Sequence, residues 1–438
     1  MSVAHFSHRA RQVLAGGPAM ACTPVPPSPT QARGRLIAKG MSMFAGQRSP
    51  MLRFAFALLF ALVAGAASAN PSMVVDVQTG RVLQAERQYE RWHPASLTKL
   101  MTALIAFQEI EAGRLTPKSP VRISLEAARK PPSHMAYPIG TIITLDNALK
   151  MMLVKSANDI AVAIAESISG SVEEFAKRMN ATARSLGMED SHFVNPHGLH
   201  DPAQYSTAYD LAVLARTIRR QYPQYDHYFS TEALKDGEHT FTGYNLLLGR
   251  FDGADGMKTG YICDSGFNII GSATRNGTTL IAVVLGEMSS KRRAEKAADL
   301  LEAAFAEVGN ESFEPVLASM SPPEDRSKDI TNVRATVCSQ EANDARWADR
   351  SLDQFASPNL HPLTREPATM TIYTGGAQGA SMSAILLAGQ YVDEIPVPDL
   401  RPVRLSDEVA EARQAAGLDL TGDRAIPIPE FRPEDSGA

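Results

Sequence analysis

The sequence predicts an α+β fold in which an antiparallel sheet is flanked by helices. Strand-like patterns stand at both ends of residues 70–309, and helical patterns fill the stretch between them. One more helical pattern, at 295–305, follows the second group of strands and closes the domain. Strands at both ends with helices between and after them favour an antiparallel sheet with helices packed on it.

Two hairpins supply most of the predicted strands. Residues 73–77 and 81–84 form the first, because two strand-like segments surround a short turn that contains Gly80. Residues 267–274 and 278–285 form the second, and Asn276-Gly277 between them is the strongest short hairpin signal. A further short strand is expected at 121–123.

Five segments between the hairpins carry apolar residues at helical spacing. The first begins after Pro94 and stops at Gly113, which places Ser96 at a helix N-terminus, where backbone N–H groups favour developing negative charge. The third is apolar on nearly all sides and is expected inside the domain. Thr207 is the expected N-cap of the last. The five segments are 97–108, 145–154, 160–168, 175–186 and 209–218.

The N-terminal 69 residues have the composition of a leader. Residues 51–69 combine a basic start, a short apolar run and the triplet Ala67-Ser68-Ala69, which are the three parts of a secretory signal. We expect cleavage near Ala69 and a mature protein that works outside the cytoplasm, in the periplasm. Residues 1–50 contain no Asp or Glu, so either a later methionine starts translation or the signal has a long basic leader.

Residues 310–438 form a C-terminal extension that is rich in Pro, Asp, Glu and Ser. Periodicity is weak except at 370–373 and 385–392, so we expect a poorly ordered tail or a small accessory region with one ordered patch. The extension has neither a transmembrane pattern nor a basic amphipathic face. The predicted domains are therefore 1–69, 70–309 and 310–438.

Composition argues against several classes of partner. The chain has 43 Lys and Arg against 48 Asp and Glu and no basic stripe, which disfavours nucleic acid. The sequence carries no zinc-type cluster and no phosphate-binding loop, so neither a metal nor a cofactor is expected. Cys22 belongs to the leader, and whether Cys263 and Cys338 pair is left open.

Three short motifs carry the candidate chemistry: Ser96-x-x-Lys99, Ser156-x-Asn158 and Lys258-Thr259-Gly260. A spacing of three places Ser96 and Lys99 on one helix face, so the amine can reach the hydroxyl and act as its base. The same three motifs, with Ser-Asp-Asn as the second, occur in order in penicillin-binding proteins and class A β-lactamases. Each alone also has an ordinary interpretation as a helix cap or a strand end.

Each residue type fits a step of acyl transfer. Lys99 can accept the Ser96 proton only if burial or a nearby positive charge, such as that of Lys258, lowers its pKa. Ser156 can relay that proton to the leaving amine, and the Asn158 amide can orient Lys99 and hold the substrate's peptide group.

The third motif is expected to bind the substrate. Lys258 and Thr259 can bind a substrate carboxylate, and Gly260 lets the strand approach the substrate closely. The backbone amides of Ser96 and Tyr261 are the expected donors to an oxyanion.

These motifs, together with Asn195-Pro196-His197-Gly198, resemble the serine D-Ala-D-Ala carboxypeptidases, which are low-molecular-mass penicillin-binding proteins. The resemblance runs from about residue 70 to residue 305. It implies a β-lactamase/transpeptidase-like domain that trims the terminal D-alanine from peptidoglycan stem pentapeptides through an acyl-serine. It also implies inhibition by β-lactam antibiotics. The tail does not resemble the second domain and terminal membrane helix of many relatives, so the resemblance does not extend to a membrane anchor.

One departure from the family pattern follows the third motif, where Tyr261-Ile262-Cys263-Asp264 replaces small or hydroxyl residues. Asp264 either brings a negative charge near Lys258 or faces solvent. Two alternative functions remain: a D,D-endopeptidase acting on cross-links with the same site, or a catalytically weak protein that binds peptidoglycan or penicillin. A β-lactamase is disfavoured, because no glutamate occupies the setting that class A enzymes use for deacylation.

Overall fold

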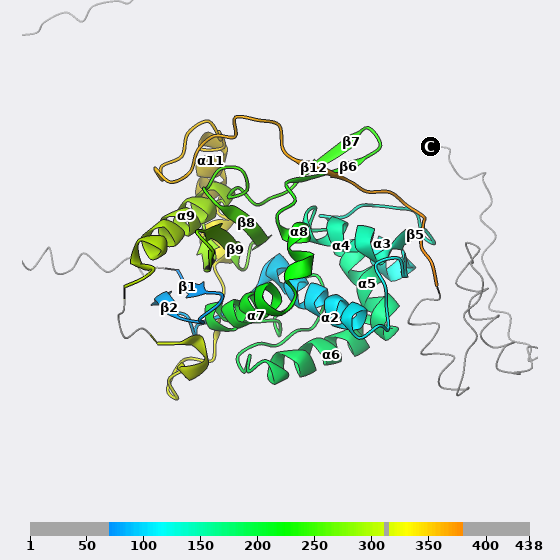
Figure 1. The fold of residues 1–438 in the computed structure, drawn as a ribbon, viewed down its shortest axis with the longest axis horizontal. Coiled ribbons are helices and arrows are strands. Elements are labelled where there is room, and N and C mark those ends of the chain that lie inside the picture. Colours follow the sequence, from blue (N-terminus) through cyan, green and yellow to red (C-terminus); the bar gives the residue numbers. More distant parts are fainter. Residues whose placement is uncertain (1–69, 311–314, 380–438) are drawn as a thin grey trace, which may run out of the picture. The chain divides into compact units, whose positions relative to one another are not determined.

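The computed structural model describes residues 70–310 and 315–379, which adopt the predicted α+β fold (Figure 1). The leader, its signal sequence and residues 380–438, including the patch expected at 385–392, lie outside the described residues. Five antiparallel strands form the main sheet in the order β2-β1-β10-β9-β8. Their bounds are β1 (Ser72–Asp76), β2 (Val82–Glu86), β8 (Ala254–Ile262), β9 (Gly266–Arg275) and β10 (Thr278–Glu287).

Both predicted hairpins are present in this sheet. Arg275 of β9 pairs with Thr278 of β10 across a two-residue turn. Asn276 and Gly277 in that turn both have a left-handed backbone, with φ of 50° and 82°. Two positive φ angles are what a tight hairpin turn requires, which explains why Asn-Gly stands there.

Helices cover both faces of the sheet. Helix α7 contacts β1 and β10, whereas α9 contacts β9 and β10. The side chain of Thr207 caps α7 as predicted, accepting the Asp210 N–H at 3.0 Å. The helices of this part are η1 (Ala95–Thr98), α2 (Lys99–Glu111), α3 (Leu125–Ala128), α4 (Leu145–Leu153), α5 (Asn158–Ser169), α6 (Val172–Ser185), α7 (Ala208–Gln221), η2 (Pro223–Tyr225), α8 (Asp226–Phe229) and α9 (Ser290–Glu307).

The sheet separates two apolar cores. Successive residues of a strand point to opposite faces, so Met73 and Val75 of β1 belong to the larger cluster, while Val74 between them belongs to the smaller. The larger cluster joins the sheet to α2, α4, α5, α6 and α7, and α5 is buried almost all round, as its apolar pattern predicted. The smaller cluster lies between the sheet and α9.

Three small sheets complete this part of the chain. Strands β4 (Pro120–Arg122) and β5 (Ile142–Thr144) pair antiparallel. Strand β3 (Arg91–Trp92) pairs in parallel with β11 (Ile330–Thr331). The hairpin of β6 (Ala233–Asp236) and β7 (His239–Thr242) gains β12 (Thr369–Thr371) as a parallel third strand beside β6. The sequence analysis did not predict this hairpin, although Gly237, the first residue of its two-residue turn, has a left-handed backbone with φ of 57° and is a turn signal.

Residues 315–379 lie against the domain as a series of short elements. Besides β11 and β12 these are η3 (Leu317–Ser319), α10 (Arg334–Val337) and α11 (Gln340–Ala348). Leu317 and Ile372 are buried in the larger core and Leu360 in the smaller. Figure 1 shows this part, yellow to orange, passing from α11 near α9 to β12 beside β6. The ordered patch expected at 370–373 overlaps β12, and the domain boundary at residue 309 stays a prediction.

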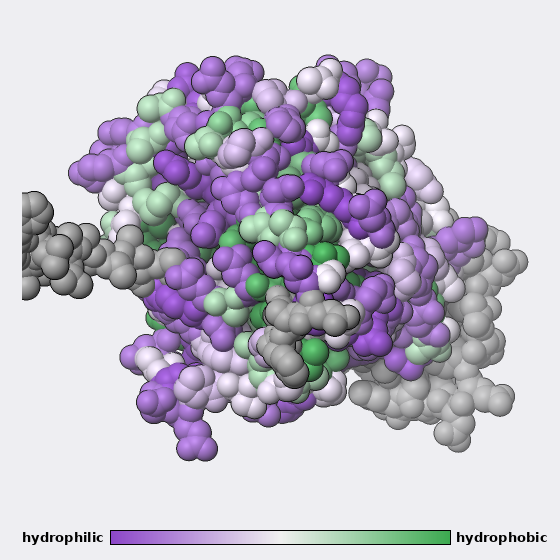
Figure 2. Space-filling view, turned by 60° about the vertical axis from the view of Figure 1, so that its left-hand side comes forward, coloured by the Kyte–Doolittle hydropathy of each residue, from purple (hydrophilic) through white to green (hydrophobic). Residues whose placement is uncertain are grey.

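The exposed surface is mainly hydrophilic on the side that Figure 2 presents, where apolar residues emerge in small groups near the centre. Most large apolar side chains belong instead to the two cores. Among the residues that the structure describes, none of the helices has the length and apolar character needed to cross a membrane.

Candidate active site

Ser96 and Lys99 lie at the junction of η1 and α2. The Lys99 Nζ atom is 3.0 Å from the Ser96 Oγ atom, as their spacing of three predicted. The preceding residue, Ala95, has a left-handed backbone with φ of 49°. Its carbonyl lies against Gly198, where any Cβ would overlap it. A glycine at 198 therefore allows that loop to pack directly under the nucleophile.

Lys99 is fully buried, and acceptors surround its amine. Besides Ser96 Oγ, Nζ contacts Asn158 Oδ1 and the His197 carbonyl oxygen, each at 2.7 Å. Burial, followed by the positive charge of Lys258, holds the pKa of Lys99 well below its ordinary value. A neutral amine has two N–H groups and one lone pair. The two carbonyl oxygens can accept both N–H groups and leave the lone pair facing the Ser96 hydroxyl.

Ser156 and Lys258 form a second serine–lysine pair beside the first. Lys258 Nζ donates to Ser156 Oγ at 2.9 Å and to the Thr259 carbonyl oxygen at 2.8 Å. Burial and then the charge of Arg293 lower the pKa of Lys258 to about 7. Ser156 has a left-handed backbone, with φ of 61°. This conformation is uncommon for a residue other than glycine and marks a locally constrained position.

Asn158 and Asp159, at the start of α5, connect Lys99 to the loop around residues 131–136. The Asn158 Nδ2 group donates to the Pro131 carbonyl oxygen at 3.0 Å, which leaves Oδ1 for the lysine. The Asp159 carboxylate accepts backbone N–H groups from Met135 and Ala136, at distances from 2.9 to 3.1 Å. This loop is thereby fixed beside the two serines.

Strand β8 passes directly beside the nucleophile. A Cβ atom at Gly260 would lie only 2.9 Å from the Ser96 backbone nitrogen and 3.1 Å from the Pro94 carbonyl oxygen, so only glycine fits. Behind the strand, the buried Arg293 donates to the carbonyl oxygens of Gly260 and Asn268 at 3.0 and 3.2 Å. Strand β8 is thus held between η1 on one side and Arg293 on the other.

These elements enclose a pocket of about 390 Å³. Six of the eight predicted site residues line it. The other two, Lys99 and Lys258, contact the lining residues Ser96 and Ser156 from the core. Tyr261, at its open side, is 40% exposed and stacks on Phe267 with ring centroids 4.1 Å apart. Within 70–310 and 315–379, no three His, Cys, Asp or Glu side chains are grouped so that they could hold a metal ion.

Three groups in this site were not predicted from the sequence. The carbonyl oxygens of His197 and Pro131 contact Lys99 and Asn158, but a backbone oxygen leaves no residue-type signal. Arg293 contacts β8 from an amphipathic helix, where arginine is common. The His197 ring accepts the Leu199 N–H at 3.0 Å and so contributes to the order of this loop.

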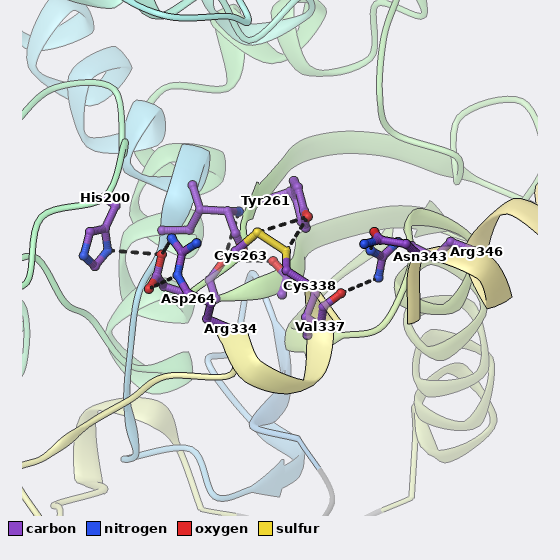
Figure 3. The surroundings of a disulfide bond; sticks show 12 residues. His200, Tyr261, Cys263, Asp264, Arg334, Val337, Cys338, Asn343 and Arg346 are labelled. Carbon is purple, nitrogen blue, oxygen red and sulfur yellow. Dashed lines mark hydrogen bonds and ion pairs between the residues drawn. A yellow bond between two sulfur atoms is a disulfide. The ribbon is translucent and has the colours of Figure 1, made fainter. Parts of the chain in front are cut away.

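The departure after the third motif has a structural cause that the sequence did not reveal. Asp264 neither faces solvent nor contacts Lys258: it is buried, and its carboxylate accepts from Asn332 Nδ2 at 2.7 Å and Arg334 Nη2 at 2.6 Å (Figure 3). Burial alone would raise the pKa of Asp264, but these two partners lower it to about 2. Cys263 forms a disulfide with Cys338, which settles the open pairing.

Comparison with known proteins assigns the chain to a family. The family model described as D-alanyl-D-alanine carboxypeptidase matches residues 61–289. The chain belongs to this family. It is 38% identical over 268 residues to D-alanyl-D-alanine carboxypeptidase DacD of Salmonella typhimurium, covering 60% of this chain and 68% of that one. It is also 38% identical to Escherichia coli DacD, covering 52% of this chain and 61% of the relative.

A solved structure supports the fold assignment. Penicillin binding protein 5 from Haemophilus influenzae superposes with a TM-score of 0.52 at 33% identity, covering 55% of this chain and 71% of that one. The predicted α+β, penicillin-binding-protein-like fold and the predicted enzyme class, a serine-type D-Ala-D-Ala carboxypeptidase, are therefore confirmed.

Proposed function

We propose that the protein removes the terminal D-alanine from peptidoglycan stem pentapeptides through an acyl-serine at Ser96. The environment of Lys99 is the observation that carries this proposal. Two carbonyl oxygens at 2.7 Å can take both N–H groups of a neutral amine, and Ser96 Oγ lies 3.0 Å away on the remaining side. A buried, neutral lysine in this arrangement is a general base for a serine nucleophile.

Acylation begins when Lys99 takes the hydroxyl proton as Ser96 Oγ attacks the carbonyl carbon of the terminal peptide bond. The bond between Oγ and carbon forms, and the carbonyl oxygen becomes an oxyanion. The backbone amides of Ser96 and Tyr261, which border the pocket, donate to this oxyanion. The passage of β8 beside the Ser96 amide supports this assignment.

The intermediate collapses when its C–N bond breaks and the leaving amine takes a proton. Ser156 donates its hydroxyl proton to this amine and takes in turn the proton that Lys99 accepted from Ser96, so Lys99 is neutral again before deacylation. Lys258, whose Nζ atom lies 2.9 Å from the Ser156 Oγ atom, holds this hydroxyl in place. Lys258, when protonated, and Thr259 bind the carboxylate of the departing D-alanine, because this carboxylate follows the scissile bond directly. Asn158 holds Lys99 in place and donates to the peptide group.

Deacylation returns the enzyme to its starting state. Lys99 takes a proton from a water molecule as the water oxygen attacks the ester carbon of the acyl-serine. The Ser96 oxygen leaves and regains its proton, and the shortened peptide leaves with a new carboxylate. Binding of a β-lactam to the same serine gives an acyl-enzyme in the same way, which the penicillin-binding name of the structural relative supports.

The substrate lies outside the cytoplasm, so the protein must be exported. We assign this step to the signal sequence at 51–69, with cleavage near Ala69. Determining the N-terminal sequence of the mature protein tests this part alone, and the expected first residue is Asn70.

Release of D-alanine from a purified pentapeptide tests the proposed function. Ser96→Ala should lower the rate at least about 10³-fold, because the nucleophile is lost. Ser185→Ala is the matched control: its hydroxyl donates to the Thr182 carbonyl oxygen on α6, away from the pocket, and the activity should be retained. Activity that survives Ser96→Ala would refute the proposal, whereas release only from cross-linked muropeptides would favour an endopeptidase.

A further inference from the structure

One wall of the pocket is in contact with residues 332–346 of the C-terminal segment, which we call the C-terminal clasp. The wall consists of Tyr261 on β8 and Phe267 on β9, whose rings stack. The clasp contains α10 and the first part of α11. It reaches the wall from more than 60 residues further along the chain, through three kinds of contact. Figure 3 shows the first two, an ion pair between Arg334 and Asp264 and a disulfide.

The first contact is an ion pair at the turn between β8 and β9. Arg334 donates to both carboxylate oxygens of Asp264, at 3.1 and 2.6 Å, and Asn332 adds a hydrogen bond at 2.7 Å. The Val333 N–H donates to the Asp264 carbonyl oxygen at 3.0 Å. His200 Nδ1, outside the clasp, lies 3.4 Å from the same carboxylate, but the clasp supplies its closest partners. Because Asp264 is buried, loss of the Arg334 guanidinium should destabilise this turn.

The second contact is covalent. The disulfide joins Cys263, two residues after Tyr261, to Cys338 at the end of α10. The Tyr261 hydroxyl lies 3.2 Å from the Cys338 Sγ atom and 3.7 Å from the Cys263 Sγ atom. The cross-link therefore forms the surface on which the end of this tyrosine side chain rests.

The third contact lies behind the wall. The Arg346 guanidinium is 5.6 Å from the Phe267 ring centroid, and Arg293 is 5.7 Å from the same centroid. Arg346 also donates to the carbonyl oxygens of Val337 and Met288, at 2.7 and 3.1 Å. It thus links the clasp to the β10–α9 connection and supports the ring on which Tyr261 stacks.

We propose that the clasp is a positioning element of the substrate pocket, in which Arg334, Cys338 and Arg346 hold the Tyr261 side chain in its place along the peptide substrate. This inference rests on the proposed function. The backbone of Tyr261 is fixed independently, because it pairs with Phe267 of β9 in the sheet register. Loss of the clasp should therefore weaken peptide binding while the Ser96–Lys99 chemistry remains intact.

Reduction of the folded enzyme tests the covalent contact. A dithiol reductant converts the disulfide to the two thiols of Cys263 and Cys338 and is itself oxidised to a cyclic disulfide. We expect the KM for a pentapeptide to rise about threefold or more, with kcat changed less than about twofold. The double variant Cys263→Ser, Cys338→Ser should show the raised KM without reductant and no further change when reductant is added.

Arg334→Gln tests the ion pair without altering a cysteine, and Arg365→Gln is its matched control. Both arginines are about half exposed and bind a carboxylate with two nitrogen contacts, but Arg365 pairs with Glu232, away from the pocket. Only Arg334→Gln should raise KM, and Arg334→Lys should partly restore it. Circular dichroism of each variant verifies that the protein is folded.

The outcomes separate the two proposals. If the wild-type enzyme releases D-alanine but reduction and Arg334→Gln leave KM unchanged, the positioning role is refuted and the proposed function stands. The same holds if Arg365→Gln raises KM equally, or if kcat alone falls. If the wild-type enzyme releases no D-alanine, the proposed function itself fails. If the double serine variant does not fold, reduction of the folded wild-type enzyme and the Arg334→Gln variant still test the positioning role of the clasp.

Discussion

Gly260→Ala should displace the nucleophile without removing any catalytic group. The added Cβ would lie 2.9 Å from the Ser96 backbone nitrogen, 3.1 Å from the Pro94 carbonyl oxygen and 3.2 Å from the Ala95 Cβ. Ordinary contacts begin at 3.4 Å, so the nearest distance is too short by about 0.5 Å. Two of these three atoms belong to the backbone and the third is attached directly to it, so none of them can rotate away, and η1 and β8 must separate.

The expected effect on rate follows from this displacement. A misplacement of 1 Å at a reacting centre can cost about 10²-fold in rate, so half that distance should cost about tenfold. Overpacking should also lower the free energy of unfolding by about 1–3 kcal/mol. The loss of rate should appear in the acylation step, because Ser96 Oγ must approach the substrate carbonyl there.

The acylation rate constant with a fluorescent penicillin measures this effect. Gly271→Ala on β9 is the control, because its Cβ would be too close only to the flexible end of the Leu247 side chain, away from Ser96. That variant should lose stability but acylate at nearly the wild-type rate. An acylation rate for Gly260→Ala within about twofold of wild type would show that β8 does not constrain the nucleophile.

Three other predictions concern charge and stability. Lys258→Gln removes the charge that lowers the pKa of Lys99, so this pKa should rise and the acid limb of the acylation pH profile should move to higher pH. Cutting the Cys263–Cys338 link, which closes a separation of 75 residues, should lower the free energy of unfolding in urea by about 4 kcal/mol. Arg293→Met leaves buried carbonyl oxygens without their donor and should destabilise the protein by about 3 kcal/mol in thermal unfolding.

Each of these three predictions would be contradicted by a specific result. An acid limb that stays in place or moves to lower pH would show that Lys258 does not govern Lys99. A loss below about 1 kcal/mol on reduction would mean that the unfolded chain gains little freedom from the cut. Wild-type stability of the Arg293 variant would mean that water or a shifted backbone satisfies the carbonyl oxygens.

Much of the fold was predictable, because its main elements carry strong local patterns. Helices α4 to α7 have apolar residues at regular helical spacing, and the β9–β10 hairpin has Asn-Gly at its turn. The C-terminal segment was not predictable in this way. Outside the patch at 370–373, it contributes single buried residues, such as Leu317, Val337 and Leu360, which are separated by polar stretches and form no period.

The candidate site also has a part that the sequence predicted and a part that it could not predict. Ser96, Lys99, Ser156 and Asn158 were identified because side chains with distinctive chemistry stand at fixed spacing. Their backbone acceptors could not be identified, since every residue has a carbonyl oxygen and only the fold decides which one faces Lys99. The role of Asp264 was also hidden, because its partner, Arg334, lies 70 residues further along the chain.

The core packing of residues 315–379 has a consequence for how the protein unfolds. The match to the carboxypeptidase family ends at residue 289, yet Leu317, Leu360 and Ile372 occupy the two apolar cores on either side of the sheet. Removing them would leave cavities in both cores at once. We therefore expect the smallest fragment that unfolds with native cooperativity to extend to at least residue 372, beyond the end of the family match.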